Sequence, residues 1–237
     1  MSSQRELKFF MARVADQAER YQDVIKYIKE IVDMGCDLNA DERNLLSVAY
    51  KALTGSCRST LRTIGAFLED DSVKKIPERV QKLTELKESL IKELDQYCNE
   101  LIEFTDSKLL KDSQSAVEKV FYEKLKGDYY RYSVEFKEGG CEENSKKAKE
   151  CYEKALDIAK EQLMKANPAY LGLALNYSVF LYEIIGKKQE AIDLADNAFK
   201  EAVDLLDELD EDEYSEATLI LQLLKDNVAL WGDEQGQ

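Results

Sequence analysis

Residues that interrupt helices are rare in this chain, since its 237 residues contain only two prolines and ten glycines. Proteins rich in strands need a turn residue at intervals of about 8–12 positions, whereas long helices need few. Apolar residues also recur with helical spacing, as Leu83, Leu86, Leu90 and Leu94 do. The sequence therefore predicts an all-α fold made of long helices.

Breaks in the apolar pattern divide the chain into nine expected helices with short links, so that neighbouring helices run antiparallel. The expected helices cover residues 4–18, 21–34, 40–70, 74–107, 117–136, 143–164, 168–185, 188–208 and 212–231. Helix-start signals are the capping boxes Asn39 with Glu42 and Ser115 with Glu118, and the N-cap Asn167 before Pro168. We expect one helical domain over residues 1–231 and a short, acidic, flexible tail at residues 232–237.

The absence of histidine restricts the chemistry that the chain can perform. It removes imidazole acid–base catalysis, Ser–His and Cys–His nucleophile pairs, and imidazole metal ligands. The cysteines are odd in number and form no CxxC pair, which favours reduced thiols; they are Cys36, Cys57, Cys98, Cys141 and Cys151. We therefore expect no enzymatic activity, no metal and no cofactor.

The formal charge of -15 opposes general attraction to nucleic acid or to anionic lipid. No apolar run approaches the roughly 20 residues that a membrane-spanning helix needs. We expect no nucleic-acid partner and no membrane insertion, and a cytoplasmic location with the nucleus as a second compartment.

A basic stripe runs against this acidic composition. Lys51, Arg58 and Arg62 follow one another at steps of seven and four residues. On a helix they fall within roughly 40° of one another around the axis. The pattern alone leaves two interpretations open, a solvated face whose cations pair with nearby acids such as Glu42, or a site for an anion.

Four segments resemble the 14-3-3 protein family. They are RNLLSVAYK (43–51), VFYEKLKGDYYRY (120–132), LGLALNYSVFLYEI (171–184) and ATLILQLLKDNVALW (217–231). The resemblance implies a cup-shaped homodimer of nine-helix subunits, each with a concave amphipathic groove. It also implies a signal-transduction adaptor that regulates client proteins by clamping phosphoserine or phosphothreonine segments in that groove.

The resemblance also assigns residues to the groove. It implies that Lys51, Arg58, Arg131 and Tyr132 bind phosphate. It implies that the peptide is held by Lys124, Leu175, Asn176, Val179, Glu183, Leu219, Ile220, Leu223, Asn227 and Trp231. Taken singly, each residue has a structural alternative, such as a solvated cation, a buried phenol or a core leucine.

Dimer formation is likewise implied by the resemblance and would use residues 1–70 and 74–107. The interface would contain Val14, Ala18, Arg20, Asp23, Thr60, Ile64, Leu86, Ser89 and Glu93. Arg20 keeps an acidic partner in Glu93, whereas Asp23 would face Ser89 where the family usually has a lysine, and Leu86 replaces a usual tyrosine. Such losses would weaken the homodimer or favour a heterodimer with another isoform.

The alternative function is a helical-repeat scaffold, similar to tetratricopeptide arrays, that binds unmodified peptides in the same groove. An enzyme would have to rely on a carboxylate pair, and Glu183 has no evident partner for one. Phosphate dependence of binding separates the adaptor from the scaffold.

Overall fold

The computed structural model describes residues 2–111, 114–137, 139 and 141–235. These residues form ten α-helices with shorter π and 3-10 segments, and no strand lies among them. The all-α prediction is therefore confirmed. The chain folds into two compact units, residues 1–109 and 110–237.

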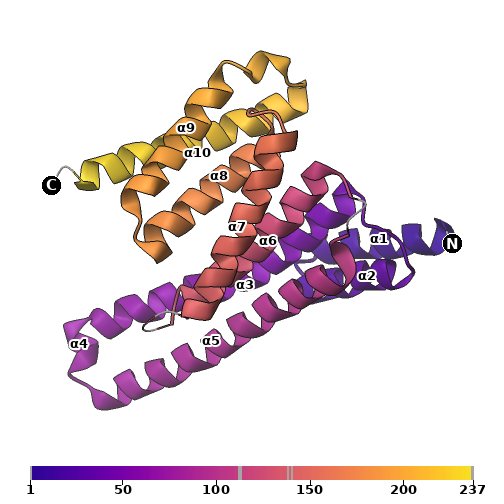
Figure 1. Cartoon of the computed structure of the whole chain (residues 1–237). Helices are drawn as coiled ribbons and strands as arrows, with labels where there is room; N and C mark the ends of the chain where they lie inside the picture. The colour runs from indigo at the N-terminus through magenta and orange to yellow at the C-terminus, as the bar shows by residue number, and fades with distance from the viewer. Residues whose placement is uncertain (1, 112–113, 138, 140, 236–237) are drawn as a thin grey trace. The chain divides into compact units, whose positions relative to one another are not determined.

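The first unit is built around two long helices, α3 and α5, which lie side by side (Figure 1). Its elements are α1 (Ser2–Gln17), α2 (Tyr21–Asp33), α3 (Ala40–Glu69), α4 (Asp71–Lys74), α5 (Pro77–Phe104) and the π-helix η1 (Thr105–Leu109). The core-facing side of α3 contains Leu46, Tyr50 and Leu61, which are all buried. Because the apolar residues recur at helical spacing on one side of α3, the opposite side of the helix faces away from the core.

The second unit contains the helix pair α6 and α7 and a group formed by α8, α9 and α10 (Figure 1). Its elements are α6 (Ala116–Val134), α7 (Glu142–Gln162), α8 (Pro168–Phe180), the π-helix η2 (Leu181–Ile185), α9 (Lys188–Val203), the 3-10 helix η3 (Leu206–Glu208) and α10 (Glu211–Gln235). Small buried residues on α9, including Ala191, Ala195 and Ala198, let the neighbouring helices pack closely.

The helix starts that capping residues predict are confirmed. Asn39 and Glu42 form a reciprocal capping box at the start of α3, and Ser115 and Glu118 form another at α6. Asn167 caps α8 by accepting a hydrogen bond from the backbone N–H of residue 169. Side-chain acceptors satisfy N–H groups that have no partner within the helix, which fixes where each helix begins.

The main differences from the predicted helix boundaries concern α5, α8, α9 and α10. The helix expected over residues 74–107 is preceded by the short α4 and begins only at Pro77, because proline favours the first helical position. The helix expected over residues 188–208 ends at Val203 and is followed by the 3-10 segment η3. The α-helical geometry of α8 gives way to the π turn η2, which Gly186 ends in the left-handed conformation (φ 74°). Finally, α10 continues to Gln235, into the segment expected to be a flexible tail.

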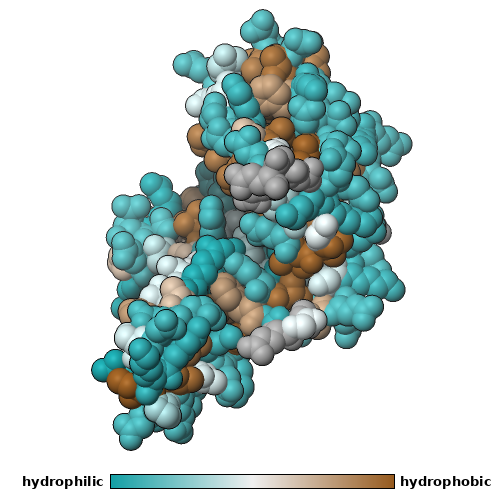
Figure 2. All heavy atoms as spheres, turned by 90° about the vertical axis from the view of Figure 1, so that its left-hand side faces the viewer, coloured by the Kyte–Doolittle hydropathy of each residue, from teal (hydrophilic) through white to brown (hydrophobic). Residues whose placement is uncertain are grey.

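Hydrophilic residues predominate on the face shown in Figure 2, where hydrophobic residues form separate small groups. This distribution agrees with a chain that carries 48 acidic and 33 basic residues. Apolar side chains that remain exposed on such a surface are candidates for binding a partner.

Candidate functional site

The α3 cations lie on the side of the helix that faces away from its core. Lys51 is exposed and Arg58 is half-buried, whereas Thr54 and Cys57 between them are buried. Two helical turns, or about 10 Å, separate Lys51 from Arg58 along the axis. Arg62 is exposed one turn further on. The predicted basic stripe is therefore present on α3.

A second group of charges lies on α6. Lys124 donates to Asp128 at 3.0 Å, and a terminal nitrogen of Arg131 lies 3.8 Å from the other Asp128 oxygen. Helical spacings of four and three residues bring these side chains together. Arg131 is only 7% exposed, and its guanidinium stacks on the ring of Tyr132, 4.8 Å from the centroid. Lys124 and Arg131, both predicted, therefore flank a carboxylate that was not predicted, and Tyr132 lies against the guanidinium of Arg131.

Helices α7 and α8 contribute to the same group. Asn176 on α8 donates its Nδ2 to both oxygens of Asp128, at 2.9 Å each. The hydroxyl of Tyr152 on α7 donates to Asp128 Oδ1 at 2.6 Å and accepts from Arg131 Nε at 3.4 Å. We call these five residues, Lys124, Asp128, Arg131, Tyr152 and Asn176, the Asp128 network. It links three helices through one buried carboxylate.

Electrostatics favour the charged forms of Asp128 and Arg131. Burial alone would raise the pKa of Asp128, but the charges of Lys124 and Arg131 and the hydrogen bonds from Tyr152 and Lys124 together outweigh burial, so the pKa lies below its usual value. Burial opposes the charge on Arg131 too, yet Tyr152 and Asp128 raise the pKa of its guanidinium. Two cations and one anion leave the network with a net positive charge. This surplus suits an anionic ligand.

The predicted apolar residues of the second unit lie on α8 and α10, which contact each other. Leu219 is 66% exposed and Leu223 is 46% exposed, whereas Leu175, Val179 and Ile220 are half-buried. The core side of α10 consists instead of Ala217, Leu221 and Leu224. Large exposed leucines on a helix that already has a buried side indicate a surface for an apolar partner.

Three further residues of the predicted peptide set differ in environment. Asn227 is half-buried on α10. Trp231 is buried and stacks on Tyr182 with ring centroids 4.5 Å apart, so it belongs to the core of the second unit rather than to an exposed end. Glu183 is exposed within the π turn η2. Its helical phase relative to Asn176 therefore differs from that of the continuous α-helix that the sequence suggested.

The predicted interface residues of the first unit divide into exposed and buried groups. Val14, Ala18, Thr60, Leu86, Ser89 and Glu93 are exposed. Ile64, by contrast, is buried in the core and offers no free surface. Arg20 donates to Asp23 within the same chain at 2.5 Å, and Glu93 accepts from the Tyr97 hydroxyl at 3.3 Å.

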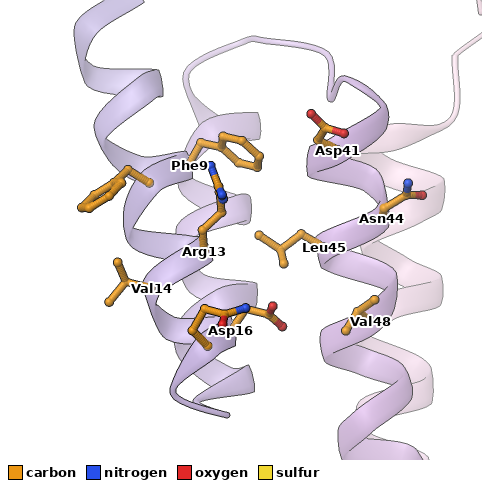
Figure 3. A pocket seen from close by; sticks show the side chains of 10 residues that line it. Phe9, Arg13, Val14, Asp16, Asp41, Asn44, Leu45 and Val48 are labelled. Carbon is orange, nitrogen blue, oxygen red and sulfur yellow. The ribbon is translucent and has the colours of Figure 1, made fainter.

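A pocket of about 780 Å³ lies between α1 and α3 in the first unit. In Figure 3, Leu45 points from α3 toward α1, where Phe9 and Arg13 lie. Val14 and Phe10 also line this pocket, and both belong to an exposed apolar stripe with Leu7. The stripe repeats at three and four residues and therefore occupies one side of α1.

The sequence analysis missed two members of the Asp128 network, Asp128 and Tyr152. The local sequence could have indicated Asp128, because a carboxylate four residues after Lys124 and three before Arg131 can pair with both side chains on a helix. Tyr152 had none, since its contact with Asp128 joins residues 24 positions apart.

Three further features concern metal ligands, membrane-spanning segments and cysteine thiols. No group of three or more side chains suited to holding a metal ion occurs among the described residues. None of the described helices is long and apolar enough to cross a bilayer. Cys57 is buried, and burial together with Glu93 raises the pKa of its thiol, which disfavours the reactive thiolate.

Comparison with known proteins agrees with the geometry. The sequence profile of the 14-3-3 protein family matches residues 11–232. The chain is 40% identical to 14-3-3 protein 2 of Entamoeba histolytica over 237 residues, which span all of this chain and 99% of the relative. It is 42% identical to 14-3-3 protein 5 of Solanum lycopersicum over 234 residues, 98% of this chain and 92% of the relative. It is also 42% identical to 14-3-3-like protein 2 of Caenorhabditis elegans over 233 residues, 98% of this chain and 93% of the relative. These matches show that the chain belongs to the 14-3-3 family.

Proposed function

We propose that this chain binds the phosphate of a client peptide through Lys51, Arg58, Arg131 and Tyr132. The family to which it belongs consists of nonenzymatic adaptors for phosphorylated client proteins, and that role extends to this chain. The observation that carries the assignment of Arg131 is the Asp128 network, in which the guanidinium of Arg131 and the ammonium of Lys124 flank one buried carboxylate.

The residue types suit a phosphomonoester. Phosphoserine and phosphothreonine carry a charge of about -1.5 to -2 near neutral pH and three strong acceptor oxygens. Two guanidiniums, an ammonium and a phenol provide the donors for those oxygens. Unmodified serine brings no negative charge to these cations, so discrimination rests on charge.

The rest of the peptide would lie along α8 and α10. Asn176 uses its N–H groups on Asp128, so its side-chain oxygen remains as an acceptor for a backbone N–H of the peptide. Asn227 would add a second amide. Apolar side chains of the peptide would contact Leu175, Val179, Leu219, Ile220 and Leu223. Lys124 and Glu183 would border the peptide, and Trp231 would support the far end through its stack on Tyr182.

Calorimetric titration with one peptide in phosphorylated and unphosphorylated forms tests this proposal. We expect the phosphorylated form to bind at least about 100-fold more tightly, because each charge-assisted hydrogen bond contributes about 1.5–3 kcal/mol. The unmodified-peptide scaffold predicts equal affinities for the two forms, as well as little effect of Arg58→Ala or Arg131→Ala. Equal affinities would exclude the adaptor role for this site.

We also propose that two copies associate through the first unit. Apolar side chains of α1 would be covered by the partner, together with Leu86 on α5. Arg20 is the cation available for Glu93 of a second chain, but its bond to Asp23 competes with that pairing. Ser89 offers no charge to Asp23, and an exposed ion pair contributes only about 0–1 kcal/mol. Apolar contact would therefore dominate the association, with either an identical chain or another isoform.

The double substitution Phe10→Asp and Val14→Asp is expected to produce monomers. Each buried apolar side chain of this size contributes about 1.5–3 kcal/mol, so the dimer dissociation constant should rise at least about 100-fold. Sedimentation equilibrium measures the change. Val203→Asp, which alters an exposed valine at the end of α9, is the matched control and should leave the dimer intact. A monomeric unsubstituted chain would refute this association.

We propose phosphorylated cytoplasmic proteins as clients, with nuclear clients as a second group. A dimer with two grooves would bind a doubly phosphorylated client with an avidity about 10²- to 10⁴-fold above that of one site, provided that the linker spans both grooves.

A further inference from the structure

Tyr152 lies at the centre of the Asp128 network although its side chain is fully buried on α7. Its hydroxyl donates to Asp128 Oδ1 at 2.6 Å and accepts from Arg131 Nε at 3.4 Å. A phenol has one donor and can accept at its oxygen, so both capacities are engaged. The hydroxyl thus connects the carboxylate with the guanidinium.

The ring of Tyr152 has little freedom to move. It stacks on the ring of Tyr177 with ring centroids 5.3 Å apart, and its centroid lies 5.4 Å from that of the Phe180 ring. Gly127 on α6 lets the Tyr152 ring pack closely against that helix, because a Cβ at position 127 would lie 2.9 Å from the ring. The hydroxyl is therefore held at a fixed place before any ligand binds.

The Tyr152 hydroxyl matters more for the position of Arg131 than for the position of Asp128. Asp128 also receives hydrogen bonds from Lys124 and Asn176. For the Arg131 side chain, the Tyr152 hydroxyl is the single hydrogen-bond acceptor in the described part of the second unit, since the contact to Asp128 is an ion pair at 3.8 Å. Tyr132 contacts only the face of the guanidinium. Removing the hydroxyl would leave the guanidinium edge without its fixed partner.

We propose that Tyr152 is a positioning residue for phosphate binding. This inference rests on the proposed function of Arg131. The Tyr152 hydroxyl engages Nε of Arg131 and leaves the remaining guanidinium N–H groups for the phosphate oxygens. Because the guanidinium is ordered in advance, phosphate binding requires less loss of side-chain freedom.

Tyr152→Phe tests the proposal, because phenylalanine keeps the ring and its stacking and removes only the hydroxyl. We expect the affinity for a phosphopeptide to fall about tenfold, the effect of one hydrogen bond to a charged group. The matched control is Tyr177→Phe, which removes a hydroxyl from the same stack, where it lies 3.4 Å from Glu153. The control should bind as the unsubstituted chain does.

A double-substitution cycle separates positioning from a general effect on packing. Lysine has no Nε–H, so in an Arg131→Lys background the further change Tyr152→Phe should have no additional effect on phosphopeptide affinity. An equal additional loss in that background would show that Tyr152 acts through the packing of the unit and would overturn the proposal.

A measurement without ligand distinguishes this inference from the proposed function. Nitrogen-15 NMR of the free protein follows hydrogen exchange at Arg131 Nε–H, which should accelerate in Tyr152→Phe and remain unchanged in Tyr177→Phe. Unchanged exchange, or unchanged affinity of Tyr152→Phe in a protein that does require phosphate, would overturn the positioning role alone. Equal binding of phosphorylated and unphosphorylated peptides by the unsubstituted protein would instead overturn the proposed function.

Discussion

Lys51→Glu is expected to lower the affinity for a phosphopeptide at least about 100-fold while leaving helicity unchanged. In the proposed site, the substitution removes one charge-assisted hydrogen bond and places a carboxylate opposite a phosphate that carries a charge of about -1.5 to -2. A loss of about 3 kcal/mol corresponds to this factor. Lys51 is exposed on α3, so the folded unit should tolerate the change. Calorimetric titration measures the affinity, and far-UV circular dichroism measures helicity.

Controls for Lys51→Glu must separate local charge from total charge. Lys146→Glu makes the same change in net charge, from -15 to -17, on an exposed α7 lysine that pairs with Glu150. It should reduce phosphopeptide affinity only slightly, because Lys146 is exposed, is not a member of the proposed phosphate set, and acts on a ligand through solvent that salt screens. Lys51→Gln, which removes the positive charge without introducing a negative one, should give a loss of phosphopeptide affinity between those of the two glutamate variants. Equal losses in Lys51→Glu and Lys146→Glu would exclude direct contact between Lys51 and phosphate.

Local sequence signals predicted the helix starts best where side chains cap the backbone N–H groups. Asn39 and Glu42 satisfy each other's backbone groups within one helical turn, so the start of α3 follows from four consecutive positions. Pro77 likewise marks the start of α5 by its own preference for the first helical position, although we predicted that start three residues too early. The end of α9 at Val203 carries no such signal. The apolar pattern continues through Leu205 and Leu206, which pack against the core without being part of the α-helix.

The candidate site was harder to predict because its contacts join distant parts of the chain. The family resemblance identified Lys124 and Arg131 and supplied their roles. The bonds of Asp128 to Asn176 span 48 positions, and no local pattern specifies such a pair. The π turn η2 also changed the phase of Glu183, which an α-helical period does not anticipate.

The charge distribution shows how an acidic protein can still bind anions. A total charge of -15 acts on distant ions mainly through solvent, where salt screens it. Arg131 is buried beside Asp128, in a less polar medium where charges interact more strongly. A carboxylate that stabilises the cations also limits their attraction for a ligand. Asp128 therefore fixes the positions of the cations in the network and at the same time reduces the net positive charge of the network.

Asp128→Ala is accordingly expected to destabilise the second unit by about 3–5 kcal/mol at neutral pH. The substitution leaves the buried Arg131 without its counter-charge and leaves Tyr152 and Asn176 without their acceptor. A change of this size should lower the unfolding midpoint by about 10 °C, which differential scanning calorimetry measures. Asp157→Ala removes an exposed carboxylate from α7 and is the matched control, which should change stability by no more than about 0.5 kcal/mol.

The effect of Asp128→Ala should also depend on pH in a defined direction. The pKa of Asp128 is lower in the folded chain than its ordinary value of 3.8, so its carboxylate stabilises the folded state fully above about pH 4. That contribution is lost as pH falls through the lowered pKa of the folded state. The stability difference between the unsubstituted chain and Asp128→Ala should therefore be constant from neutral pH down to about pH 4 and narrow below it. A difference that widened in acid would show that folding raises the pKa of Asp128, and the surrounding cations could then not be the groups that stabilise its carboxylate.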